Sequence, residues 1–143
     1  MVKDNAKSVL QLEKMAFENI QFARDTASSA QNVDYNMEFT REVSAGEDGN
    51  HFLVKLTANL KSKESETIRI KITLVGYFIC CCEDEALKMK LINYNSIAIL
   101  FPYIRSQISL ITAQPDLTPV VLPPVNIVEM FEETEAEESD NEE

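Results

Sequence analysis

Two consecutive segments in the middle of the chain alternate apolar and polar residues with the period of a β-strand. From residue 52 to residue 61, apolar side chains occupy every second position, and the same alternation runs from residue 68 to residue 74. Such a period places one side of a strand in a core and the other in water. The polar stretch Ser62–Glu66 separates the two segments, so the pattern predicts a β-hairpin. Beyond Gly76 both sides become apolar, which predicts that another element or another chain covers both faces there.

Two further strands are predicted upstream. Tyr35, Met37 and Phe39 alternate with polar residues, and Val43 keeps the phase before the turn-forming residues 45–50. Residues 9–22 alternate with two breaks of phase, and a helix also fits part of this segment. Because a β-bulge shifts a period of two by one residue, we predict a bulged strand here. Residues 25–34 would then form a crossover loop.

The period changes after the strands. Apolar residues recur at spacings of three and four from Ile97 to Ile111, which predicts a helix with one apolar stripe. Pro102 lies within this stripe and should kink the helix or begin a new first turn. Prolines then keep the chain extended until Asn126, which can cap a second short helix. The predicted fold class is therefore α+β, a four-stranded antiparallel sheet with two C-terminal helices on one face.

Composition and charge indicate one domain and exclude some partners. Eight of the residues 132–143 are acidic and account for most of the formal charge of −11, so residues 1–131 are nearly balanced. We predict a single domain over 1–131 and a disordered acidic tail over 132–143 that aids solubility, with a docking role as the alternative. Nucleic acid and anionic membranes are unfavourable partners for such a chain. The polar N-terminus and the lack of a long apolar run predict a cytoplasmic protein.

Candidate catalytic or metal-binding groups are sparse. Cys80, Cys81 and Cys82 are adjacent, and His51 is the single histidine. Adjacent cysteines suit neither a disulfide framework nor the usual spacing of zinc ligands, so we interpret them as small apolar residues that finish a buried strand. Without a Gly-rich loop or a clustered nucleophile and base, the sequence predicts no enzyme and no cofactor.

Two motifs carry a family resemblance. Phe101-Pro102-Tyr103-Ile104-Arg105 is followed about twenty residues later by Leu122-Pro123-Pro124-Val125-Asn126 and Phe131. In this order, and after four strand-like segments, they resemble the C-terminal half of the SecB protein-export chaperone family. The resemblance covers about Leu10 to Phe131. It implies an ATP-independent holdase that assembles as a homotetramer, a dimer of dimers, and binds unfolded polypeptides in long apolar grooves.

The resemblance also implies which residues contact such clients. Methionine and aromatic side chains suit promiscuous recognition because they offer large and adaptable contact area. Core packing is the alternative role for each of them. The candidate polypeptide-binding residues are Tyr35, Met37, Phe39, Val43, Ile127, Met130 and Phe131.

The chain departs from the family at the surface that docks the SecA motor. Similar export chaperones carry acidic residues there, and the matching positions are Asn19, Ala23 and Lys71. Because none is acidic and Lys71 reverses the charge, we predict that SecA is not engaged in the usual way. The acidic tail could substitute, or the client could be an antitoxin, as for SecB-like members associated with a toxin–antitoxin pair. An acidic binding or inhibitor protein remains a second class of function.

Overall fold

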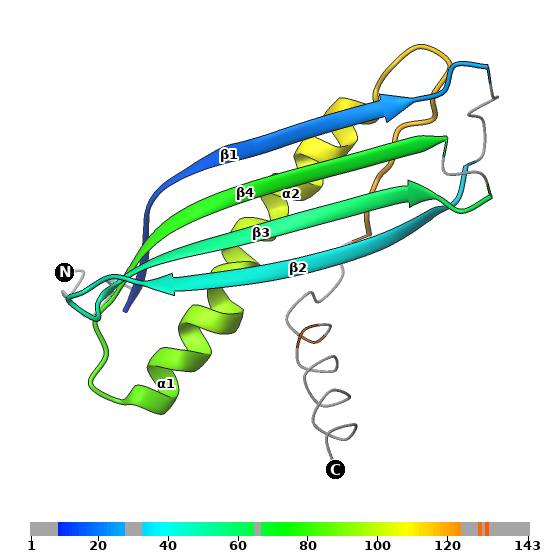
Figure 1. Ribbon diagram of the computed structural model, residues 1–143. Helices are drawn as coiled ribbons and strands as arrows, with labels where there is room; N and C mark the ends of the chain where they lie inside the picture. The colour runs from blue at the N-terminus through cyan, green and yellow to red at the C-terminus, as the bar shows by residue number, and fades with distance from the viewer. Residues whose placement is uncertain (1–8, 28–32, 65–66, 124–128, 130, 132–143) are drawn as a thin grey trace, which may run out of the picture.

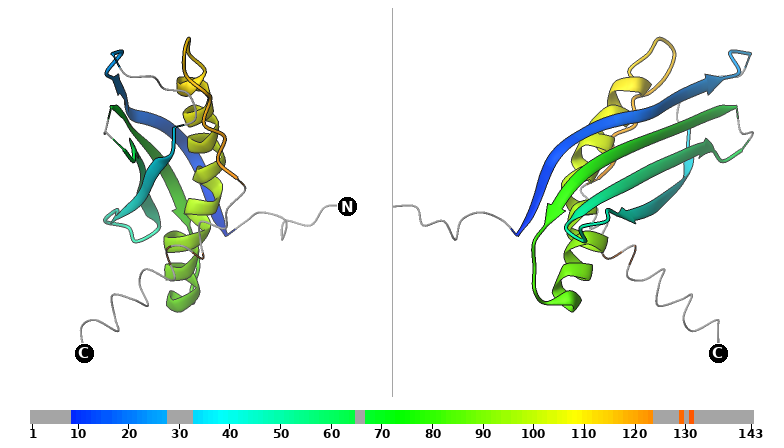
Figure 2. Two further views of the ribbon diagram at one scale, coloured as in Figure 1. Left: turned by 90° about the vertical axis from the view of Figure 1, so that its right-hand side faces the viewer. Right: turned by 60° about the vertical axis from the view of Figure 1, so that its left-hand side comes forward.

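The computed structural model describes residues 9–27, 33–64, 67–123, 129 and 131. Within them, one sheet of four antiparallel strands is backed on one face by a helical segment (Figure 1), which confirms the predicted α+β fold. Figure 2 shows these two layers from the side. The elements are β1 (Leu10–Arg24), β2 (Tyr35–Ala45), β3 (His51–Ser62), β4 (Ile68–Cys80), α1 (Glu85–Lys90), a π-helical segment (Leu91–Asn95) and α2 (Ser96–Thr112).

The order of the strands in the sheet is β1-β4-β3-β2, so β1 and β2 are the two edges. The connection between these two strands must therefore pass from one edge of the sheet to the other, as the predicted crossover requires. Its middle, residues 28–32, lies outside the described residues. The predicted hairpin is also confirmed, because β3 pairs with β4 in a register that sets Leu56 opposite Leu74.

Strand β1 contains the two bulges that its phase breaks predicted. The register with β4 shifts between Leu12 and Lys14 and again between Phe17 and Asn19, so Glu13 and Glu18 are the inserted residues. Each insertion returns the next apolar residue to the face that α2 covers, here called the inner face. The opposite, outer face stays mostly polar.

Within a single copy of the chain, the outer face is only partly covered at the C-terminal half of β4, so the predicted covering by another chain stays a prediction. Val75 is buried, but Tyr77 and Ile79 stay half-exposed in a single copy of the chain. The ammonium group of Lys14 lies 4.5 Å from the centre of the Tyr77 ring, which covers part of it. A buried thiol, Cys80, ends the strand.

The helical segment begins earlier than predicted. Asp84 caps α1, because its carboxylate accepts hydrogen bonds from the backbone N–H groups of Ala86 and Leu87. A π-helical segment joins α1 to α2, and Pro102 lies inside α2. The second predicted helix falls almost wholly outside the described residues, of which only Glu129 and Phe131 remain, both helical. No helix in the described part of the chain is long and apolar enough to cross a lipid bilayer.

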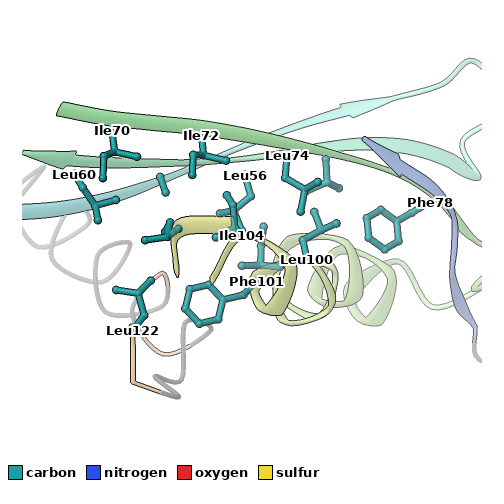
Figure 3. Close-up of a cluster of buried hydrophobic side chains, with 14 of the residues drawn as sticks. Leu56, Leu60, Ile70, Ile72, Leu74, Phe78, Leu100, Phe101, Ile104 and Leu122 are labelled. Carbon is teal, nitrogen blue, oxygen red and sulfur yellow. The ribbon is translucent and has the colours of Figure 1, made fainter. Parts of the chain in front are cut away.

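The core lies between the inner face and α2. Leu100 and Ile104 of α2 are fully buried against side chains of β3 and β4 (Figure 3), and Ile108 is fully buried as well. Gly76 permits this close approach, because a Cβ atom there would lie 2.9 Å from Leu100 Cδ2 and 2.6 Å from Phe78 Cε2. Each large apolar side chain buried in this layer contributes about 1.5–3 kcal/mol to stability. The layer is therefore the main source of stability.

Candidate functional site

The inner face of the edge strand β2 carries four of the predicted polypeptide-binding residues. The register with β3 sets Met37 opposite Leu60, Phe39 opposite Ala58 and Val43 opposite Val54, all on the inner face. Tyr35, Phe39 and Val43 pack against the rim of the core, whereas 44% of the Met37 surface is exposed. The ring of Phe39 meets that of Phe101 edge-on, with 5.7 Å between centroids. Phe39 is thus partly a core residue, and Met37 is open to solvent.

A hollow of about 280 Å³ lies where β2 begins. One wall is the end of the crossover and the start of β2, and the other is the chain after α2. Tyr35 and Met37 are the predicted site residues that line it. We name this hollow the β2 groove, and its lining consists of Val33, Asp34, Tyr35, Met37, Lys63, Thr118, Pro119 and Val120.

The segment 113–123 that forms the second wall is fixed at both of its ends. Near its start, a carboxylate oxygen of Asp116 lies 2.7 Å from a guanidinium nitrogen of Arg24, the last residue of β1. Further along, the backbone N–H of Val120 donates to Thr112 Oγ1 at 2.8 Å, and Ser109 Oγ donates to the Val120 carbonyl at 2.9 Å. These bonds hold the wall at a set distance from β2.

Tyr35 places an unsatisfied polar atom beside the β2 groove. Its hydroxyl oxygen is buried and has no hydrogen-bond partner. Burial raises the pKa of this phenol, and the positive charge of Arg24 opposes the shift in part. An unpaired buried hydroxyl costs about 1–3 kcal/mol, so this atom lowers the stability of the free protein.

Arg41 is a site residue that the sequence analysis missed. It lies on the inner face of β2, where its guanidinium donates to the carbonyl oxygen of Asn93 at 2.6 Å, in the π-helical segment. The central carbon of the Arg41 guanidinium lies 5.3 Å from the ring centre of Tyr94 and 4.9 Å from the ring centre of Phe131. Arg41 therefore ties the helical segment and position 131 to β2. The sequence signal for this role was a charged residue at a position of β2 where the alternation otherwise places apolar residues.

The remaining predicted residues divide between two regions. Phe131 packs partly buried against the core, whereas Ile127 and Met130 lie outside the described residues. The partner-docking candidates lie together on the outer face. Asn19 pairs with Thr73, Gln21 pairs with Lys71, and Ala23 pairs with Arg69.

The cysteines fit their predicted role only in part. Cys80 is fully buried at the end of β4, and burial raises the pKa of its thiol. Cys81 is exposed and Cys82 half-exposed beyond the strand, which corrects the interpretation of all three as buried residues, because the strand ends at Cys80. No three His, Cys, Asp or Glu side chains in the described ranges come together as metal ligands.

One family model matches most of the chain. The family model described as "Preprotein translocase subunit SecB" matches residues 6–138. The uncharacterized protein MJ0357 of Methanocaldococcus jannaschii is 30% identical over 113 residues, which cover 77% of this chain and 70% of that protein.

A solved structure shows the same fold. The SecB-like chaperone Rv1957 of Mycobacterium tuberculosis, in complex with a ChAD peptide from the Rv1956 HigA1 antitoxin, is similar with a TM-score of 0.66 and 19% identity. The match covers 81% of this chain and 87% of that one. A protein of unknown function from Streptococcus agalactiae matches with a TM-score of 0.44 and 11% identity, over 80% of this chain and 96% of that one.

Proposed function

The chain belongs to the SecB family, and from this premise we propose that it is an ATP-independent chaperone that holds non-native polypeptide segments in the β2 groove. The observation that carries the proposal is a partly apolar hollow beside an edge strand of the sheet. Tyr35 and Met37 line the hollow, and within the described part of the chain β2 pairs with β3 alone. An extended client could pair its backbone with the free edge while its apolar side chains enter the hollow.

The affinity would come from many small apolar contacts. Each Å² of apolar client surface removed from water contributes roughly 25 cal/mol, and ordering the client subtracts from that sum. A folded protein hides the surface in question and has no free extended backbone, so it would not be held.

Self-association is part of the proposal. On the β1 side of the inner face, Phe17 and Ile20 are large apolar residues left exposed in a single copy, and Leu110 on α2 is exposed as well. Contiguous apolar surface of this kind is typical of interfaces between chains. We propose that these residues help to join copies into the dimer of dimers that the family resemblance implies.

A dedicated client is the second candidate function. The SecB-like chaperone that shares this fold binds a peptide of an antitoxin. The outer face here carries Asn19, Ala23 and Lys71 instead of acidic residues. Together these observations favour delivery of one client over general service to an export motor. In this alternative the β2 groove takes a single peptide segment rather than many.

The test is arrest of refolding. Stoichiometric protein without ATP is added to a reduced, slowly folding precursor, and the mass of the complex is read by size exclusion with light scattering. Arrest in a complex of tetrameric size supports the holdase, whereas unhindered refolding without a complex contradicts general holding. Binding of an antitoxin-type peptide in the second case would leave the dedicated chaperone.

A comparison of two methionine substitutions tests where the client binds. Met37 in the β2 groove is 44% exposed, and Met89 on α1 is 49% exposed, so Met89→Glu is a matched control for Met37→Glu. Met37→Glu removes about half of the apolar contact that a bound client would make with this side chain, and it places a charge in the β2 groove. We expect it to cost about 1.4 kcal/mol or more of binding free energy, which is roughly tenfold in affinity. Equal effects of the two substitutions on client affinity would contradict the proposed groove.

A further inference from the structure

The outer face carries a second and larger hollow, of about 570 Å³, that client holding does not use. It lies where the end of β1, the start of β4 and the end of β3 run side by side. Its outer-face side chains are three cations, two amides and one small residue. We name it the basic hollow, and these residues are Lys61, Arg69, Lys71, Gln21, Asn59 and Ala23.

The strand register brings the three cations together. Lys61 is paired with Arg69, and Asn59 with Lys71, while Ala23 on the edge strand is paired with Arg69 and leaves space beside it. Like charges on neighbouring strands repel one another, so this arrangement costs stability unless an anion lies nearby.

The cations of the basic hollow lack an acidic partner within the described ranges, although another lysine on the same face has one. Lys55 binds Glu18 at 3.2 Å, whereas no ion pair joins Lys61, Arg69 or Lys71 to a described residue. Glu38 of β2, opposite Asn59, and Asp25, whose N–H donates to the Thr67 carbonyl, are described carboxylates near the hollow, but neither lines it. The lining residues carry three positive charges and no negative charge, in a chain whose formal charge is −11.

We propose that the acidic segment 132–143 of the same chain binds in the basic hollow. Eight of its residues are Asp or Glu, and it contains no Lys, Arg or His. No other stretch of the sequence has a comparable density of negative charge. The segment follows Phe131 directly, so it is held near the sheet at a high effective concentration, on the order of millimolar for a short flexible connection.

The distance allows this contact. Phe131 rests on Arg41, which is paired with Leu56 of β3, and Leu56 is paired with Leu74 of β4. Lys71 is three residues from Leu74 along β4. With strands about 4.8 Å apart and about 3.3 Å per residue, the path around the β2 edge is roughly 20–25 Å. Twelve extended residues reach about 40 Å, so the segment can pass the edge and still lie across several cations.

The inference does not depend on client holding, and the test therefore needs no client. A carbodiimide joins lysine amines to carboxylates in direct contact, and mass spectrometry identifies the linked residues. In the full chain we expect Lys61 and Lys71 to be linked to residues 132–143, and we expect high salt to suppress these links because the contact is ionic. Lys90, exposed on α1, serves as the reference lysine.

Two variants and one mixing experiment make the result decisive. Arg69→Glu should lower the yield of the links at Lys61 and Lys71 by roughly fivefold, whereas Lys90→Glu should leave it unchanged. A mixture of isotopically light and heavy protein should give links within one chain only. Mixed-isotope links would overturn the proposal in favour of a second copy. Absent links, or links equally distributed over Lys90, would also overturn it, and an acidic partner protein would then become the better occupant.

Discussion

Replacing Gly76 by alanine should destabilise the protein, because this glycine lies under α2 where the helix approaches β4. The added Cβ would lie 2.6 Å from Phe78 Cε2 and 2.9 Å from Leu100 Cδ2, both closer than carbon atoms approach without displacement. Phe78 and Leu100 are fully buried, with neighbours on all sides. Neither side chain can move aside without disturbing the core.

The magnitude follows from two opposing terms. Overpacking by one methyl group in a close-packed core costs about 1–3 kcal/mol. Because Gly76 does not have a positive φ, alanine can adopt its backbone conformation, and the reduced entropy of the unfolded chain returns about 0.4–1 kcal/mol. The free energy of unfolding should therefore fall by about 1–2 kcal/mol, which corresponds to a decrease in melting temperature of roughly 3–7 °C for a chain of this length.

A double-mutant cycle with Leu100→Ala identifies the cause. Leu100→Ala alone should cost about 2–5 kcal/mol through the cavity that it creates. In the double variant the contact of the new Cβ with Leu100 is removed while that with Phe78 Cε2 remains, so the two effects should be less than additive by about 0.5–1 kcal/mol. Chemical unfolding of the four proteins, at one protein concentration, measures the coupling. Gly76→Ala at or above wild-type stability, or strictly additive effects, would refute the packing argument.

Three further predictions concern polar contacts. Tyr35→Phe should raise the free energy of unfolding of the free protein by about 1 kcal/mol in chemical unfolding, because it removes an unpaired buried hydroxyl. Arg24→Ala should increase amide hydrogen exchange in residues 113–123 with a loss of stability of about 1 kcal/mol, since its partner Asp116 is 59% exposed and returns to water. The N–H groups of Asn50 and His51 hold the pKa of Asp48 at about 2, below its ordinary 3.8. Its contribution to stability is therefore present above about pH 4 and lost as the pH falls towards 2, so Asp48→Asn should flatten this part of the unfolding profile.

Local pattern was sufficient to predict the strands and their faces. A period of two depends only on neighbouring residues, and each break of phase in β1 corresponds to one inserted residue, Glu13 or Glu18. The same logic assigned the apolar stripe of α2. It missed α1 because Glu85–Lys90 is too short to show a period, although Asp84 followed by Glu85 is a recognisable start signal for a helix.

The contacts that shape the β2 groove could not be predicted in this way. Arg24 and Asp116 are far apart in the sequence and meet only because the chain after α2 returns to the end of β1. Arg41 meets Asn93 because the π-helical segment lies over β2. Such pairs depend on topology and on the exact course of loops, which periodicity does not encode. Residue type alone also left core packing and client binding undecided for Phe39.

The register brings two of the predicted partner-docking positions together on the outer face. Ala23 and Lys71 are far apart in the sequence, but in the sheet both line the basic hollow beside Lys61 and Arg69. A surface of this charge repels a basic docking segment and attracts an acidic one. If segment 132–143 occupies it, a partner must either displace that segment or bind the segment itself, and both routes should weaken as salt concentration rises.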